Sequence, residues 1–265
     1  TPFALAHDSR PLFQWAPRGS SQAAFTLEGD DAATGRSIWR SNKISSSTPS
    51  FQYPDSAPAL PPAATYNWRL RTHDDNGAVS PFAAAAFHIA PSPDTWSNVS
   101  WLGDAKLNVY STTLDVHNAP ATMTLYVAGL GISVVSVNGK TLNTLTTTPW
   151  TNNAHIVGYS SYNISGAMQA AGTKIVVSLG NGWRDSIFAV RDPGDKSKIG
   201  AFPRMLRAFV KATYADGASR TVSYTGDGKW MGAQGPSTYD SVYNGENYDA
   251  RVARATPPRT PRWRT

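Results

Sequence analysis

Short runs in which apolar and polar residues alternate recur along the whole chain, and each ends in a cluster of turn-forming residues. In the first part of the chain these runs occupy 11–15, 23–27, 66–71 and 85–89. Asn76-Gly77 lies between the last two runs and is a strong signal for a tight hairpin turn. Alternation with a period of two places every second side chain on the same face of a strand. The pattern therefore predicts strands that bury one face and expose the other.

The same pattern continues through the rest of the chain. Further strands are predicted at 106–116, 122–127, 132–137, 156–162, 174–179, 205–214 and 220–224, with turns at 128–131, 138–139 and 215–217. One short helix is expected at 165–171, ended by Gly172. Thr, Ser, Val, Tyr and Trp are plentiful, whereas Glu28 and Glu246 are the only glutamates. This composition favours an all-β fold.

The runs and turns predict three segments. Residues 1–92 are expected to form a small β-sandwich, since several short strands occur in fewer than a hundred residues. Residues 93–250 are expected to form a double-sheet jelly roll, after a stiff linker at 91–93. The basic segment 251–265 is interrupted by three prolines and is expected to be disordered.

The distribution of charge argues against a nucleic-acid-binding protein. The formal net charge is +6, but five of the 24 basic residues are arginines in 251–265, which contains no acid. The other 19 basic residues face 18 acidic ones, a balance of +1. A body so close to neutral has no evident stripe of cations to follow a phosphate backbone.

Several other classes of site are excluded by what the sequence lacks. There are no cysteines, so no disulfide and no thiolate metal site can form. No apolar run approaches the length of a membrane span, and we expect no membrane partner. The triplets Asn98-Val-Ser100 and Asn163-Ile-Ser165 match the acceptor for N-glycosylation, which favours a secreted protein.

The motifs of the first segment resemble a known domain. They are Phe13-Gln-Trp15, Gln22, Trp39-Arg-Ser41, Ser45-Ser46 and Tyr66-x-Trp68-x-x-Arg71-x-x-Asp74-x-x-Gly77-x-x-Ser80. In this order they resemble the fibronectin-III-like domain that opens α-L-rhamnosidases of glycoside hydrolase family 78. The resemblance implies a fibronectin-III-like β-sandwich over 1–92.

The second segment resembles the jelly-roll domain that follows in the same family and is related to rhamnose-binding modules of carbohydrate-binding family 67. The motifs are Ala128-Gly-Leu-Gly131, Val137-Asn-Gly139, Pro149-Trp-Thr151, Leu179-Gly-Asn-Gly-Trp183, Tyr214-Ala-Asp-Gly217, Trp230 and Tyr243-x-Gly-Glu-x-Tyr-Asp-Ala-Arg251. In that family the sugar is cleaved in an (α/α)6 barrel beyond these domains. The resemblance therefore implies a non-catalytic region, and no catalytic residue is carried over to this chain.

Candidate sugar contacts lie in the predicted loops of the second segment. An exposed indole can stack on the apolar face of a pyranose, which makes Trp150 and Trp183 candidates for a sugar platform. The alternative for both is packing in the core, which we expect for the other tryptophans. Rhamnose-containing glycans are the partner that the resemblance implies, and we expect a monomer.

Polar residues flank these two tryptophans. Asn152, Asn153 and Asn181 could bond to sugar hydroxyls, and Arg184 completes the predicted sugar-binding set. Asp185 could supply oxygen to Ca²⁺, through which some modules of the resembled family hold rhamnose. Asn and Asp are also common turn residues, and turn chemistry is the alternative explanation.

Two other functions stay open at this point. The region could be a structural fragment that braces the catalytic barrel of a longer rhamnosidase, with Glu246 organising the contact surface through Arg251 or backbone donors. It could also be a stand-alone hydrolase or lyase for rhamnosyl–uronate linkages. In that case Asp carboxylates, for which Asp185 is the residue to test, or Tyr and His as base would act on the bond, while Arg184 or Arg191 held the acidic sugar.

Overall fold

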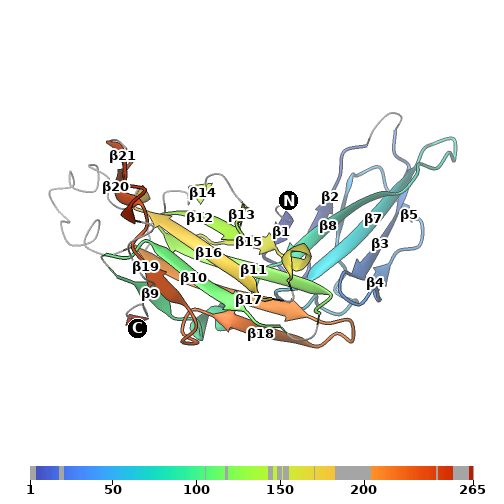
Figure 1. Cartoon of the computed structure of the whole chain (residues 1–265). Helices are drawn as coiled ribbons and strands as arrows, with labels where there is room; N and C mark the ends of the chain where they lie inside the picture. Colours follow the sequence, from blue (N-terminus) through green and yellow to red (C-terminus); the bar gives the residue numbers. More distant parts are fainter. Residues whose placement is uncertain are drawn as a thin grey trace. The chain divides into compact units, whose positions relative to one another are not determined.

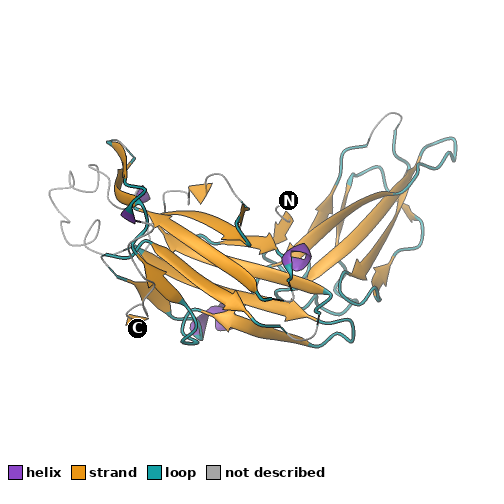
Figure 2. Cartoon of the chain, in the orientation of Figure 1, coloured by secondary structure: helices purple, strands orange, loops and turns teal. Residues whose placement is uncertain are grey.

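The computed structural model describes residues 4–17, 21–104, 106–116, 119–142, 146–147, 151, 155–169, 171–182, 204–242, 244–252 and 263–264. The chain divides into two compact units. The first is formed by Thr1–Trp96 together with Pro120–Thr122 and Thr213–Ser219, and the second by the remainder. Strands dominate both units (Figure 2), so the all-β prediction is confirmed. No described helix is long and apolar enough to cross a membrane.

The first unit is built from two sheets (Figure 1). The larger has the order β1-β8-β7-β3-β4, with β5 also paired to β3, and the smaller is β2-β6. The bounds are β1 Ala4–Ala6, β2 Leu12–Gln14, β3 Ala24–Asp31, β4 Ser37–Arg40, β5 Ile44–Ser45, β6 Ser50–Gln52, β7 Thr65–His73 and β8 Ala83–Ile89. All four predicted strands of this part are present, and β3, β7 and β8 run further than predicted.

Aromatic side chains fill the space between these two sheets. Phe13 of β2 lies 5.1 Å from Trp68 of β7 and 5.4 Å from Phe87 of β8, measured between ring centroids. Trp39 of β4 stacks on Phe51 of β6 at 4.9 Å. Such tilted and offset ring pairs are the favourable arrangements for aromatic side chains. The prediction that Trp39 and Trp68 pack against the core is confirmed.

Gln22 connects three separate motifs of the first unit. Its side-chain oxygen accepts a hydrogen bond of 2.7 Å from the Trp15 indole. Its amide nitrogen donates to the carbonyl oxygens of Ser46 and Thr48 at 2.9 and 3.1 Å. Gln22 is buried, so its amide cannot bond to water, and these three hydrogen bonds take the place of the bonds to water.

The second unit contains two six-stranded sheets and a two-stranded ribbon. One sheet has the order β13-β12-β16-β10-β19 with β14 on β12, the other has the order β15-β11-β17-β9-β22 with β18 on β17, and the ribbon is β20-β21. The bounds are β9 Trp101–Gly103, β10 Val109–Leu114, β11 Thr122–Leu130, β12 Ile132–Val137, β13 Lys140–Thr141, β14 Thr146–Thr147, β15 Ser160–Asn163, β16 Thr173–Gly180, β17 Met205–Thr213, β18 Ser219–Tyr224, β19 Met231–Ala233, β20 Ser237–Ser241, β21 Gly245–Tyr248 and β22 Trp263–Arg264.

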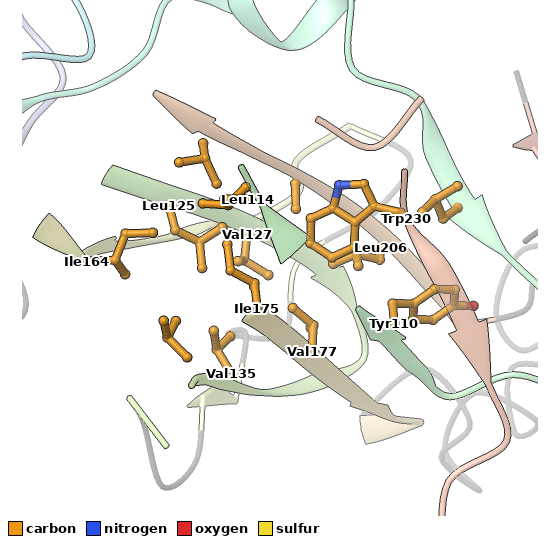
Figure 3. Close-up of a cluster of buried hydrophobic side chains, with 14 of the residues drawn as sticks. Tyr110, Leu114, Leu125, Val127, Val135, Ile164, Ile175, Val177, Leu206 and Trp230 are labelled. Atoms are coloured by element: carbon orange, nitrogen blue, oxygen red, sulfur yellow. The ribbon is translucent and has the colours of Figure 1, made fainter. Parts of the chain in front are cut away.

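The core of the second unit lies between its two large sheets. Figure 3 shows Val135, Ile175, Val177 and Tyr110 of the first sheet among Leu125, Val127 and Leu206 of the second. Trp230, which precedes β19, is fully buried among them and donates from its indole nitrogen to the Ser223 hydroxyl at 3.2 Å. Alternate residues of β10, β12 and β16 face this core, as a period of two requires.

The other large sheet does not follow simple alternation. In β11 every residue between the two ends is buried, because both faces of this strand are covered. On the face away from the main core, Tyr126 stacks on Phe209 of β17 with 4.5 Å between ring centroids. Apart from Thr124, the interior of the strand is an apolar run, typical of a strand buried on both sides.

The prediction of a turn over 128–131 was wrong for its first three residues. β11 continues to Leu130, and β12 begins at Ile132, so Gly131 alone reverses the chain. Gly131 has a φ of +127°, and a Cβ at this position would collide with the carbonyl oxygen of Gly180. Only glycine satisfies both conditions.

The helix expected over 165–171 was also too long. A 3-10 helix covers only Ser165–Ala167, and Met168 returns to extended backbone. The hydroxyl of Ser165 bonds Asn163, and its oxygen accepts from the backbone N–H of Met123, which ties the segment to β11. Ser and Gly are weak helix formers, and these local bonds compete with helix formation.

Several short strands, among them β4, β6, β20 and β21, were not predicted, and two further short elements lie where a linker and disorder were expected. Helix α1, Pro93–Ser97, begins with Pro at its first position, where the missing N–H costs nothing, at a site interpreted as linker. In the basic segment 251–265, Trp263 and Arg264 form β22 and pair with Leu102 and Trp101 of β9.

Candidate functional site

The site predicted from the motifs lies where β16 ends, and Asn181 is the predicted sugar-contact residue that the structure describes there. Its backbone N–H donates to Oδ1 of Asp240 on β20 at 2.5 Å. Its side-chain amide donates to the carbonyl oxygen of Asp240 at 2.9 Å. Asn181 therefore has a structural role, fastening the end of β16 to β20.

Arg204 binds the other oxygen of the same carboxylate. Its Nη1 lies 3.2 Å from Oδ2 of Asp240. The side chains are only 16% and 18% exposed, so water screens this pair less than a surface ion pair. Asn181, Asp240 and Arg204 form a cluster that we call the Asp240 junction, in which both carboxylate oxygens are engaged.

Close backbone packing surrounds the Asp240 junction. A Cβ on Gly180 would lie 3.1 Å from Oδ1 of Asp240. Gly182 has a φ of +60°, and a Cβ there would lie 3.0 Å from the side chain of Ile132. The two glycines of the Leu179-Gly-Asn-Gly-Trp183 motif are therefore needed because they let β12, β16 and β20 approach one another closely.

A second buried polar group supports the same end of the unit. Asn108, next to β10, donates from its side-chain amide to the carbonyl of Ser237 at 2.8 Å. Its side-chain oxygen accepts from the N–H of Gly235 at 2.5 Å. Together these bonds hold the segment that leads from β19 into β20, whose backbone groups would otherwise lack partners.

The β20–β21 ribbon presents apolar surface. Tyr239, Val242 and Tyr248 are 42%, 40% and 67% exposed, and all three belong to this ribbon or its turn. Glu246 of β21 lies opposite Asp240 of β20 in the strand register, and it is exposed. A cluster of exposed large apolar groups is typical of a contact surface.

The hypothesis that Glu246 acts through Arg251 is not what the structure shows. Arg251 instead binds the carboxylate of Asp249 with two nitrogens, at 2.9 and 2.8 Å. This bidentate pair lowers the pKa of Asp249, chiefly through the side-chain hydrogen bonds. The motif Gly-Glu-x-Tyr-Asp-Ala-Arg thus contains its own ion pair two residues apart.

Most of the predicted sugar-binding set lies outside the described residues. This applies to Trp150, Asn152, Asn153, Trp183 and Arg184, and also to Asp185, the candidate calcium ligand. Within the described part of the chain, no three His, Asp or Glu side chains come together as metal ligands. Asp240 is not suited to a cation, because Arg204 already occupies one side of its carboxylate.

Sequence reasoning missed the residues that organise this end of the sandwich. Asp240, Arg204 and Asn108 belong to no motif that we singled out. The one available signal was Asn108, a polar residue between Leu107 and Val109 in an apolar run, where an amide must find buried partners. Asp240 and Arg204 carry no comparable local signal.

Comparison with known families decides the relationship of the chain. Residues 118–257 match the model of the α-L-rhamnosidase N-terminal domain. The chain belongs to this rhamnosidase N-terminal domain family. Residues 3–91 match a second model, the N-terminal immunoglobulin domain of Rha78A-like proteins. The resemblance to rhamnosidase N-terminal domains is thereby confirmed, whereas the finer fibronectin-III-like description of the first sandwich stays a prediction.

Relatives of this rhamnosidase region are much longer than the chain. An α-L-rhamnosidase of Formosa agariphila is 23% identical over 94% of the chain, which spans 30% of that relative. The native rhamnosidase structure from Aspergillus terreus is 21% identical, with a TM-score of 0.76 over 96% of the chain and 30% of its own. The Streptomyces avermitilis rhamnosidase complexed with L-rhamnose is 15% identical, with a TM-score of 0.59 over 96% and 42%. At these identities the structural matches establish the shared fold.

Proposed function

We propose that the jelly-roll unit binds rhamnose-containing glycosides without cleaving them. Membership of the α-L-rhamnosidase N-terminal domain family is the observation that carries the proposal. The relative from Streptomyces avermitilis, described in complex with L-rhamnose, agrees with this choice of sugar. The candidate contacts are those predicted from the sequence, with Trp183 as stacking platform and Asp185 as calcium ligand.

The Asp240 junction supports the proposal indirectly. A sugar site needs its backbone held by supporting contacts, and Asn181 and Arg204 are both bound to the Asp240 carboxylate. Asn181 is two positions before Trp183, so the chain is fastened close to the proposed platform. In this role Asn181 positions the site, and its side chain is already shared with Asp240.

The test is isothermal titration of the 265-residue chain with L-rhamnose, once in calcium and once in EDTA. A shallow monosaccharide site buries little surface, so a dissociation constant of about 1 mM is expected. Trp183→Ala should abolish the heat, whereas Tyr224→Ala, which removes an exposed aromatic at the end of β18, should leave it unchanged. Absence of heat in both buffers would overturn the proposal. Equal heat in calcium and in EDTA would show that binding does not need calcium.

A second candidate function is to brace the catalytic part of a longer rhamnosidase. The observation that favours it is the exposed apolar surface of Tyr239, Val242 and Tyr248 on the β20–β21 ribbon. The intact mass of the native polypeptide would show whether a further domain is present. Hydrogen exchange should then be slower at residues 237–248 in the longer protein than in this chain. Equal exchange in both would count against bracing at this ribbon.

Secretion and a monomeric state are part of the same proposal. Asn98 and Asn163 of the two acceptor triplets are both exposed, as glycosylation in a secreted protein would require. The hydrolase or lyase alternative depends on Arg184, Asp185 and Arg191, all outside the described residues. Turnover of a rhamnosyl–uronate substrate, lost in Asp185→Asn, would be needed to support it.

A further inference from the structure

The outer face of the larger sheet in the first unit carries a row of charged residues. Glu28 of β3 is paired with Arg40 of β4 on one side and with Arg69 of β7 on the other. Arg40 Nη1 lies 2.5 Å and Arg69 Nε lies 2.6 Å from Oε2 of Glu28. Arg40 also binds Asp30 at 3.0 Å. Figure 1 shows β3, β4 and β7 in one sheet, so the row crosses three strands.

The cations of this row are more exposed than its anions. The side chains of Arg40 and Arg69 are 46% and 47% exposed, whereas that of Glu28 is only 16% exposed. The two guanidinium groups share one carboxylate oxygen of Glu28, and each has further N–H donors that this contact does not use. Asp30 is 29% exposed, so the row is balanced in formal charge, but its guanidinium groups are more exposed than its carboxylates.

Phe82, just before β8, lies between two of the arginines of β7. The Arg69 and Arg71 guanidinium carbons are 4.8 and 4.9 Å from its ring centroid. The ring is 39% exposed, so it is both a cation–π partner and an accessible apolar surface. A solvent-facing ring flanked by two guanidinium groups is a suitable platform for a ligand with an apolar face and an anionic group.

Arg71 is a cation of this face that is paired with no acid in the described part of the chain. Its Nε is buried without a hydrogen-bond partner, and it forms no ion pair with any of the described residues. Burial lowers the pKa of the adjacent His73, and the charges of Lys43 and Arg71 lower it further. The end of the face at Arg71 therefore carries uncompensated positive charge, which an anion would neutralise.

We propose that this face binds an anionic glycan through its carboxylates. Arg71 and Arg69 would hold a uronate carboxylate, and Phe82 would contact the C–H face of the same sugar ring. Ala84 and Ala86, opposite Arg69 and Asn67 in the register, are exposed and leave room above β8 for neighbouring sugars. This site lies in the first unit and is independent of the rhamnoside site proposed above for the second.

The experiment measures binding of the 265-residue chain to polygalacturonate by affinity electrophoresis and titration calorimetry. The matched ligand is the same polymer with its carboxylates esterified, which keeps the sugar rings and removes the charge. We expect binding to polygalacturonate, weaker at high salt, and none to the ester. Arg71→Gln and Phe82→Ala should each weaken binding about tenfold, by loss of one charge-assisted contact or of the stacking surface.

Arg36→Gln is the control, because it removes one exposed cation of the same unit in the turn between β3 and β4, away from Phe82. It should leave binding within about twofold, the change that screened charge alone gives. Equal weakening by Arg36→Gln, or equal binding of the esterified polymer, would overturn the proposal. Equally tight binding of double-stranded DNA would also overturn it, because the face would then be a general polyanion surface. Neutral L-rhamnose tests the other site, so the two proposals fail separately.

Discussion

Nη1 of Arg204 lies 3.2 Å from Oδ2 of Asp240, while Oδ1 of the same carboxylate accepts the backbone N–H of Asn181. One side chain on β20 thus joins the end of β16 to the start of β17. The partners are 59 and 36 residues away from Asp240 in the sequence. Substitutions at Asp240 and Arg204 therefore test how much this junction stabilises the second unit.

Asp240→Ala should lower the free energy of unfolding by about 2–4 kcal/mol, because it removes the partner of a largely buried guanidinium and of a backbone N–H. Asp240→Asn should lose less, since the amide oxygen can still accept the Asn181 bond. Urea denaturation measures both, and a double-mutant cycle with Arg204→Met isolates the coupling. A coupling near zero would show that Arg204 and Asp240 act independently.

Gly131→Ala should be far more damaging than Gly139→Ala. Both glycines have positive φ, +127° and +78°, so both substitutions strain the backbone. At Gly139 a Cβ meets nothing within 4 Å, and the loss should be about 1 kcal/mol. At Gly131 the Cβ also collides with the backbone at Gly180, which cannot move aside as a side chain would. Thermal denaturation of the two variants separates the effect of backbone strain from that of the collision. Equal losses of stability in Gly131→Ala and Gly139→Ala would contradict this account.

Trp230→Ala should cost about 3–5 kcal/mol of unfolding free energy, because it leaves a large cavity between the two sheets of the jelly roll. Trp230→Phe keeps most of the volume and loses the bond to Ser223, so a smaller loss is expected. Chemical denaturation provides the measurement, with the exposed Tyr224→Ala as the comparison. A small effect of Trp230→Ala would mean that the core closes around the gap.

The chain should lose stability above about pH 10, the ordinary tyrosine pKa. Burial raises the pKa of Tyr66 and of Tyr126, with smaller contributions from Asp31 and Tyr159 respectively. A raised pKa means that the folded state keeps the proton longer than the unfolded state. Stability is thus complete below the unfolded pKa and falls by up to about 1.4 kcal/mol per pH unit per tyrosine above it.

Urea denaturation at a series of alkaline pH values checks this expectation. Tyr66→Phe and Tyr126→Phe should each make the decline shallower, because phenylalanine has no hydroxyl to ionise. Tyr248→Phe, which removes an exposed hydroxyl, is the control and should keep the wild-type slope. A slope that none of the three variants changes would assign the alkaline decline to other groups.

The strand pattern was readable from the sequence because a period of two is a local property. Strand ends were less readable. β3 was predicted to end at residue 27, yet it continues to Asp31, because Arg40 and Arg69 neutralise Glu28 from the neighbouring strands. An acidic residue in a strand disfavours it locally, and the cross-strand ion pairs reverse that preference.

The contacts of Asn181 were less predictable than the strands. Asn181 was selected as a sugar ligand because Asn suits sugar hydroxyls, yet its amide donates to the backbone of Asp240. The selection could not distinguish these roles, since an amide donates equally well to a ligand or to a strand that arrives from elsewhere in the chain.

By itself the sequence determined the all-β class, the longer strands of both units, the Asn138-Gly139 turn with φ values of +50° and +78°, and the family resemblance. These features depend on residues close together in the chain. Tertiary structure alone decided that Asp240 meets Asn181 and Arg204, that Gln22 joins Trp15 to Ser46, and that Arg71 finds no counter-ion among the residues that the structure describes. Each of these depends on the packing of distant strands, where burial and charge are set by neighbours that no local pattern specifies.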